Sequence, residues 1–193
     1  MIASPSRVIL LGLVASSILL LTGTASAKLA ATPSTTITAP SSVNQVSTAG
    51  DLNGDGYSDL VVAHSGLVQV YLGSASGLHT GPDWQIVDPG GAANFGISAT
   101  VAGDLNGDHI DDLVIGSTGN SSGIGGAVYV YFGGTDLASR PQGGTDYPPS
   151  WYVTADPNTS GLVNFGGAVS GAGDLNGDGV DDLVVAAPIT GTT

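Results

Sequence analysis

Several residue types that often stabilise, charge or activate a protein are absent or scarce in this chain of 193 residues. There is no cysteine, which excludes disulfide bridges, thiolate nucleophiles and cysteine-based metal sites. Only three lysine and arginine residues stand against 16 acidic residues, and every acidic residue is an aspartate. Because nucleic-acid binding depends on lysine and arginine neutralising phosphates, we expect no nucleic acid among the partners.

The chain also lacks an apolar run long enough to cross a membrane. Residues 8–21 are apolar but fall short of the ~20 residues that a membrane-spanning helix needs. Arg7 precedes this run, and Ala-Ser-Ala at residues 25–27 supplies a cleavage pattern of small residues. We therefore predict a secretory signal peptide at residues 1–27, a secreted or cell-surface location, and no membrane span after cleavage. Residues 28–42, rich in Ala, Thr, Ser and Pro, are predicted to be a flexible linker.

The aspartates are concentrated in three copies of one nine-residue pattern. DLNGDGYSD begins at Asp51, DLNGDHIDD at Asp104 and DLNGDGVDD at Asp174. Each copy follows Ala-Gly and precedes an apolar run. The turn-forming tendency of Asn, Asp and Gly would explain one copy, but not three. Recurrence at this spacing predicts a repeat architecture.

Helix patterns are missing after residue 27, and short β-rich segments flank each copy of the pattern instead. Four antiparallel strands per repeat are predicted, with the acidic pattern joining the first strand to the second. A proline ahead of each fourth strand is typical of an edge strand. The predicted strands are residues 97–102 and 168–172 (first), 60–63, 113–115 and 183–186 (second), 68–72 and 127–132 (third), and 84–87 and 151–154 (fourth).

Four-stranded sheets repeated along a chain favour a β-propeller, in which the sheets stack radially. The predicted fold class is therefore all-β, a propeller segment of about two and a half four-stranded blades within residues 43–193. The predicted repeats are residues 43–88, 94–155 and, in part, 164–193. Trp84 and Trp151 occupy equivalent positions in two repeats, and we expect them to pack between neighbouring blades.

A Phe-Gly pair stands nine residues before two of the three patterns, at Phe95-Gly96 and Phe165-Gly166. With the acidic loops and Ala-Ala-Pro at residues 186–188, the chain resembles the FG-GAP repeat of the integrin α-subunit N-terminal propeller and its bacterial relatives. The first repeat has Ser-Val in the Phe-Gly place. The resemblance implies a ring of seven blades, so we interpret the chain as a bacterial secreted member of this family or a fragment of one.

Each nine-residue pattern places oxygen ligands at alternating positions. Hard cations such as Ca²⁺ take about 6 to 8 oxygen ligands from carboxylates, amides, carbonyls and water. We predict up to three Ca²⁺ sites, each with three carboxylates, one amide and one backbone carbonyl, and the resemblance implies the same metal and positions. The predicted ligands are Asp51, Asn53, Asp55, the Tyr57 carbonyl and Asp59; Asp104, Asn106, Asp108, the Ile110 carbonyl and Asp112; and Asp174, Asn176, Asp178, the Val180 carbonyl and Asp182.

Two alternatives compete with a calcium site built on a β-loop. An EF-hand or dockerin-like loop needs an acidic residue at position 12, where this chain has Val62, Ile115 and Val185. A metal-free polar turn would leave three or four carboxylates to repel one another. At position 6, glycine provides positive φ in two copies, and we expect the copy with His109 to be strained or weaker. Asp111 and Asp181, at position 8, are predicted to face solvent.

Catalytic constellations are lacking in the sequence. The three histidines lie away from any recognisable nucleophile motif, and the paired aspartates are better explained as metal ligands. We predict a secreted calcium-binding repeat protein that acts as a non-catalytic binding or adhesion module for an extracellular protein or glycan. The alternative is the non-catalytic N-terminal part of a larger secreted hydrolase. If the chain is not a fragment, either several chains associate to complete one ring or the final apolar strand is an open sheet edge prone to aggregation. Asn120 and Asn158 fit the N-glycosylation pattern.

Overall fold

A computed structural model describes residues 7–10, 17–22, 35–38, 43–89, 94–119, 125–140, 147–155 and 164–187. The chain divides into two compact units, Met1–Ser42 and Val43–Thr193. The cleavage pattern at residues 25–27, both N-glycosylation patterns and Pro188 lie outside the described residues. Within those residues, no helix is both long enough and apolar enough to cross a membrane.

The N-terminal unit contains one antiparallel sheet in the order β1-β2-β3. Its strands are β1 (Arg7–Leu10), β2 (Ser17–Thr22) and β3 (Thr35–Thr38). β3 lies within the stretch that the sequence predicts as a linker, and its Thr and Ile residues are ones that fit a pleated surface. Ile37 is buried. The signal peptide and the linker boundaries stay predictions.

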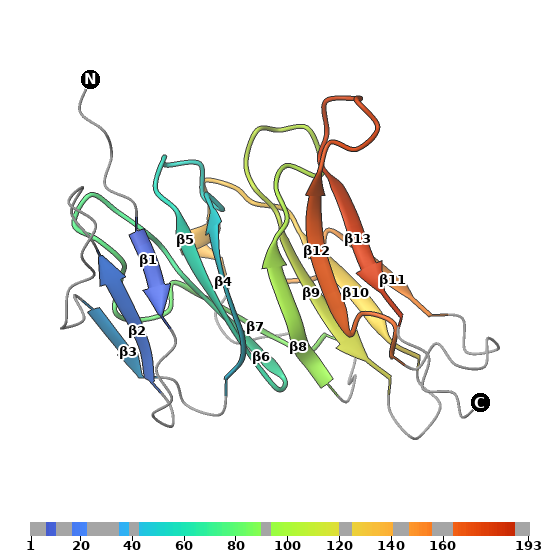
Figure 1. The fold of residues 1–193 in the computed structure, drawn as a ribbon, viewed down its shortest axis with the longest axis horizontal. Helices are drawn as coiled ribbons and strands as arrows, with labels where there is room; N and C mark the ends of the chain where they lie inside the picture. Colours follow the sequence, from blue (N-terminus) through green and yellow to red (C-terminus); the bar gives the residue numbers. More distant parts are fainter. Residues whose placement is uncertain are drawn as a thin grey trace. The chain divides into compact units, whose positions relative to one another are not determined.

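The described residues of the second unit form three antiparallel sheets, each following the chain order of its strands (Figure 1). Blade 1 is the sheet of β4 (Val43–Gly50), β5 (Asp59–His64), β6 (Leu67–Tyr71) and β7 (Trp84–Val87). Blade 2 is the sheet of β8 (Asn94–Val101), β9 (Leu113–Thr118), β10 (Ala127–Tyr131) and β11 (Trp151–Thr154). Blade 3 contributes β12 (Ala168–Gly173) and β13 (Asp182–Ala186), and a short 3₁₀ helix, Leu137–Ser139, follows β10.

The first strands of the three blades, β4, β8 and β12, lie next to one another, so the sheets stack face to face (Figure 1). The prediction of an all-β propeller segment of about two and a half blades is therefore confirmed. β7 and β11 lie at the outer edges of their sheets, as the prolines ahead of them predict. Such radial stacking leaves only short sheet edges.

The main hydrophobic core lies between blades 1 and 2. Phe95 of the Phe-Gly pair is fully buried there, and its ring lies 5.5 Å from that of Tyr129 in an edge-on arrangement. Trp84 is 1% exposed and packs on Tyr131 of the next blade, which confirms its predicted place between blades. A second cluster, which includes Val114 and Val169, joins blade 2 to blade 3. The blades are thus fixed relative to one another by side chains of consecutive repeats.

Candidate metal-binding loops

Each nine-residue pattern forms the connection from the first to the second strand of its blade. We call residues 51–59 loop 1, residues 104–112 loop 2 and residues 174–182 loop 3. The three loops are structurally equivalent, because each connects the first and second strands of its own blade. The predicted ligands of each loop therefore lie within one short connection, and the loops follow one another along the stacked blades.

The first aspartate of each loop organises the turn by accepting backbone hydrogen bonds. The Asp51 carboxylate accepts the N–H of Asp55 at 3.0 Å and that of Gly56 at 2.6 Å. Asp104 and Asp174 accept the corresponding bonds in loops 2 and 3. Because the chain has so few lysine and arginine residues, these backbone N–H groups stabilise the carboxylate charge in their place.

These bonds also change the acidity of the first aspartates. Desolvation works to raise the pKa of Asp104, but N–H donors from His109, Gly107, Asp108 and Asn106 outweigh it and hold the pKa below its ordinary value. For Asp174, the hydrogen bond from the Gly179 N–H is the largest cause of a lowered pKa. Both carboxylates are therefore kept in the charged form that a metal ligand requires.

Positions 3 and 5 are linked by the same contacts in loops 1 and 2. The Asn53 side-chain carbonyl accepts the N–H of Asp55 at 3.2 Å, and its amide donates to the Asp55 carboxylate at 3.0 Å. Asn106 makes both contacts with Asp108. In loop 3, the Asn176 carbonyl likewise accepts the Asp178 N–H. The amide and carboxylate oxygens thus lie on neighbouring parts of one turn.

The ninth aspartate closes the loop and ties it to the sheet. Asp59 accepts the N–H of Leu52 at 2.8 Å with one oxygen and that of Gly73 at 2.9 Å with the other. Asp112 accepts the N–H groups of Leu105 and Gly133 in the same way. The contact to the glycine after the third strand was not predicted, although the Val-Tyr-Leu-Gly and Val-Tyr-Phe-Gly sequences carry it in both repeats.

Burial makes these ninth aspartates harder to ionise. Asp59 is 2% exposed and Asp112 is fully buried. Desolvation raises the pKa of each to about 6, against the lowering effect of its two backbone N–H donors. Neighbouring carboxylates of the same loop, including Asp51 and Asp55 for Asp59, add to the increase. Loops 1 and 2 thus each hold a buried carboxylate whose charge the two N–H donors compensate only in part, and a nearby cation would favour its charged form.

The backbone at position 6 has the conformation that the sequence predicts. Gly56 and Gly179 have φ values of 86° and 92°. His109 has φ of 68° and, among the described residues, is the one non-glycine residue with positive φ. Its side chain is 94% exposed, and its Nδ1 lies 3.7 Å from the Asp104 carboxylate. Loop 2 therefore keeps the turn at the cost of backbone strain.

The side chains are not arranged as a closed metal cage. Among the described residues, no three His, Asp or Glu side chains converge closely enough to hold an ion. The carboxylates at positions 1, 5 and 9 instead accept hydrogen bonds within the protein. A carboxylate has about four lone-pair sites, so these bonds leave acceptor capacity for a cation. The donor set, made only of oxygen, suits a hard cation such as Ca²⁺.

The aspartates at position 8 do not simply face solvent, and that prediction is wrong. Asp111 lies half-buried and accepts the N–H of Asp51, in the preceding blade, at 2.7 Å. Asp181 accepts the N–H of Asp104 at 3.0 Å. Sequence reasoning treated each loop in isolation and so missed a contact that exists only between blades. The sole signal in the sequence is that position 8 is Asp in loops 2 and 3 but Ser58 in loop 1.

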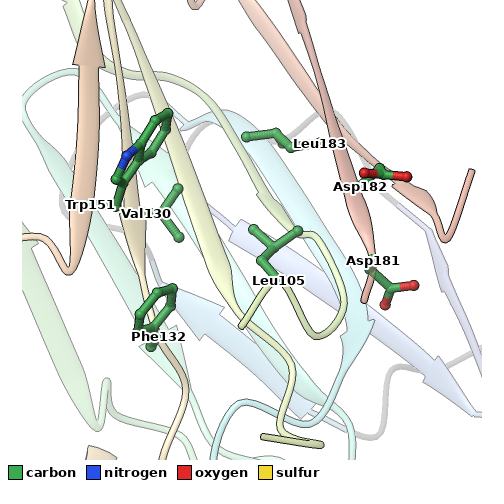
Figure 2. A pocket seen from close by; sticks show the side chains of 7 residues that line it. All are labelled: Leu105, Val130, Phe132, Trp151, Asp181, Asp182 and Leu183. Atoms are coloured by element: carbon green, nitrogen blue, oxygen red, sulfur yellow. The ribbon is translucent and has the colours of Figure 1, made fainter. Parts of the chain in front are cut away.

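A groove of about 360 Å³ lies between blade 2 and blade 3 (Figure 2). One blade earlier, residues equivalent to its lining form a closed core: Leu52, Trp84 and Leu113 are all buried. We therefore interpret the groove as a packing surface between blades. Its lining residues are Leu105, Val130, Phe132, Trp151, Asp181, Asp182 and Leu183.

Comparison with known proteins gives matches to two family models. Residues 51–115 match the model described as an FG-GAP-like repeat, and residues 165–192 match the FG-GAP repeat. Integrin alpha-X of Mus musculus is 37% identical over 93 residues, which are 48% of this chain and 7% of that protein. Integrin alpha-PS5 of Drosophila melanogaster is 32% identical over 154 residues, covering 72% of this chain and 14% of that protein. The chain thus spans only a small part of the length of these relatives.

Proposed function

The chain belongs to the FG-GAP repeat family, and from this premise we propose that it is a secreted, calcium-binding propeller module that binds a partner and catalyses no reaction. The single observation that carries the calcium part is the threefold occurrence of one loop. Loops 1, 2 and 3 have the same ligand set, the same backbone turn and the same position in consecutive blades. Stability of the turn alone does not require this concentration of carboxylates.

In each loop, the ion would be held by the side-chain oxygens at positions 1, 3, 5 and 9 and by the backbone carbonyl at position 7. When bound, Ca²⁺ supplies positive charge that compensates the carboxylates of the loop. The chain itself contributes the preformed turn, because the first aspartate fixes the N–H groups of positions 5 and 6. In loops 1 and 2, it also contributes the anchored ninth aspartate, which connects the loop to the glycine after the third strand.

A binding role is supported by the family and by the places of the three histidines. His64 is fully buried and contacts Gln69, and His79 contacts Asp83 at 2.8 Å. His109 belongs to loop 2. None of these contacts pairs a histidine with a serine or threonine hydroxyl, the arrangement that activates such a nucleophile. We propose an extracellular protein or a glycan as the partner, and the loops that connect strands as its contact surface.

The test is calorimetric titration of the chain with Ca²⁺, combined with thermal unfolding in calcium and in excess chelator. The parent chain should bind up to three ions and melt at a higher temperature in calcium. At 100 times the dissociation constant, one site adds about 2.7 kcal/mol to the free energy of unfolding. A variant with Asp55→Asn, Asp108→Asn and Asp178→Asn keeps an acceptor oxygen for the N–H at position 7 but removes one charge per loop. This variant should lose the calcium effect and stay folded.

A matched control changes an exposed aspartate outside the loops. Asp136 is 61% exposed and pairs with Arg140, so Asp136→Asn removes the same charge without touching a predicted ligand. Its calcium response should equal that of the parent. Equal melting temperatures in calcium and chelator for the parent chain, with no heat of binding, would show that the loops are metal-free turns.

A further inference from the structure

Neighbouring loops are joined by a pair of reciprocal hydrogen bonds. The Asp51 N–H donates to the Asp111 carboxylate at 2.7 Å, and the Asp111 N–H donates to the Asp51 carbonyl at 3.3 Å. Asp104 and Asp181 repeat both bonds one blade later, at 3.0 Å and 2.9 Å. The aspartate at position 8 of one loop is thus hydrogen-bonded to the backbone of the aspartate at position 1 of the preceding loop.

The glycine before each loop makes room for this contact. At Gly103, an added Cβ would clash with the Asp181 carboxylate. At Gly50, it would clash with the Val101 side chain and come within 2.8 Å of the Asp111 carboxylate. At Gly173, where no described blade follows, an added Cβ would meet nothing within 4 Å. The glycine before loop 1 and the glycine before loop 2 therefore leave room for the position 8 carboxylate of the following blade.

Side chains beside position 8 cover the preceding loop as well. The Ile110 side chain packs against Gly54, 3.3 Å from where a Cβ would lie. The second residue of each loop reflects this covering, since Leu52 is fully buried whereas Leu175 is 70% exposed. Blade 2 therefore covers the start of loop 1 around Leu52, whereas residues 54–58 stay exposed, and no described residue covers Leu175 of loop 3 in the same way.

Asp51, which is hydrogen-bonded to Asp111, also organises the predicted calcium site of loop 1. Asp51 supplies the first predicted ligand and accepts the N–H groups of Asp55 and Gly56. Fixing its backbone limits the conformations that loop 1 must lose when an ion binds. Asp111 itself lies between two predicted ligands of loop 2, the Ile110 carbonyl and Asp112. An ion in loop 2 would hold Asp111 in place and so favour binding in loop 1.

We propose that Asp111 and Asp181 are positioning residues that make the cation affinities of loops 1 and 2 depend on the blade that follows each of them. This inference rests on the proposed calcium binding. The contact has a direction, because Asp111 holds loop 1 and Asp181 holds loop 2. The resulting coupling between ions bound in two neighbouring loops is reciprocal. Loop 1 has Ser58 at position 8, and this residue makes no such contact with another described loop.

Terbium luminescence can test this in the full chain, because Tb³⁺ replaces Ca²⁺ and is sensitised by a nearby aromatic ring. Tyr57 is the one aromatic residue within the three loops and reports on loop 1. The loop 1 signal is the part of the luminescence that Tyr57→Phe abolishes. Asp111→Ala should weaken Tb³⁺ binding to loop 1 about 10-fold or more, as expected for a lost hydrogen bond to a charged group. Asp111→Asn keeps an acceptor oxygen and should lose less.

Asp181→Ala and Ser58→Ala are the matched controls, and both should leave loop 1 within about twofold of the parent. Asp111→Ala with unchanged affinity at loop 1 would overturn the coupling while leaving calcium binding intact. A parent chain without any Tyr57-dependent signal would instead refute metal binding at loop 1, and the coupling with it. The two failures are therefore distinguishable.

A metal-free measurement covers the case in which Asp111→Ala fails to fold. In chelator, amide exchange followed by NMR should be faster at Asp51 in Asp111→Asn, and unchanged at Asp104. Asp181→Asn should give the opposite result. Equal loss of protection at both amides, or none at either, would overturn the pairwise contact.

Discussion

The ring of Trp84 lies edge-on to that of Tyr131, with centroids 5.6 Å apart and planes at 80°. Trp84 comes from the fourth strand of blade 1 and Tyr131 from the third strand of blade 2. The Arg140 guanidinium lies over the same indole, 5.0 Å from its centroid, and donates a hydrogen bond to the Phe132 carbonyl at 2.9 Å. One tryptophan thus joins two consecutive repeats through aromatic and cation–π contacts.

Trp84→Ala should destabilise the chain far more than Trp151→Ala, although the two residues are equivalent in sequence. Trp84 is 1% exposed and Trp151 is 51% exposed. Removing a buried tryptophan costs about 3–5 kcal/mol, whereas a surface change is usually within about 0.5 kcal/mol. Urea unfolding of both variants gives the comparison. Similar losses of free energy would contradict the packing described between blades 1 and 2.

This pair also shows what the sequence could and could not predict. The recurrence of strands and loops was enough to predict the blades, because each repeat carries its own periodicity and turn residues. Burial of Trp84 or Trp151 depends on what the following blade places over it, and no pattern around the residue itself carries that information. The same reasoning explains why the interblade contact of Asp111 was missed.

Strand ends were less predictable than strand identity. β8 begins at Asn94, before the predicted residue 97, and β9 continues to Thr118 rather than ending at Ile115. The extension pairs Phe95 with Ser117 across a shift in register between Phe95 and Ser98. Such an irregularity restores pairing after two extra residues on β8, and the Gly-Ser-Thr sequence of β9 would otherwise predict a loop.

Tyr131→Phe should leave the free energy of unfolding unchanged or raise it slightly. The Tyr131 hydroxyl is buried and has no hydrogen-bond partner among the described residues. An unsatisfied buried hydroxyl costs about 1–3 kcal/mol, and phenylalanine keeps the ring that contacts Trp84. Tyr71→Phe is the control. The Tyr71 hydroxyl donates a hydrogen bond to Gln69 at 3.3 Å, so its removal should lower the free energy of unfolding. A large loss for Tyr131→Phe, measured by urea unfolding, would reveal a partner for this hydroxyl.

In chelator, the free energy of unfolding should fall as the pH rises from about 4 to about 7. Burial raises the pKa of Asp59 and Asp112 to about 6, above the ordinary value of 3.8. The folded chain therefore binds more protons than the unfolded chain in this window. The stability that protonation provides is complete below about pH 4 and is lost as the pH rises through 6. Urea unfolding across this range measures the slope.

Replacing both residues, by Asp59→Asn and Asp112→Asn, should flatten this dependence because the titrating groups are gone. Saturating calcium should also flatten it in the parent chain, since a bound cation favours the charged carboxylate in the folded state. A chelated parent chain that becomes more stable from pH 4 to pH 7 would contradict the raised pKa values.

His109→Gly should stabilise the chain, and Gly56→His should destabilise it, by similar amounts. Both residues occupy position 6 with positive φ, 68° for His109 and 86° for Gly56. An added Cβ at Gly56 would meet nothing within 4 Å, so the exchange tests the backbone rather than a clash. A left-handed conformation costs a non-glycine residue about 1–2 kcal/mol, partly offset by the greater freedom of glycine in the unfolded chain. We expect a change of about 1 kcal/mol in each direction, measured by urea unfolding in chelator.

Calcium titration of the same variants should show tighter binding in loop 2 after His109→Gly and weaker binding in loop 1 after Gly56→His. If both exchanges left stability and affinity unchanged, His109 would be unstrained, and loop 2 would have no reason to bind calcium less tightly than its neighbours.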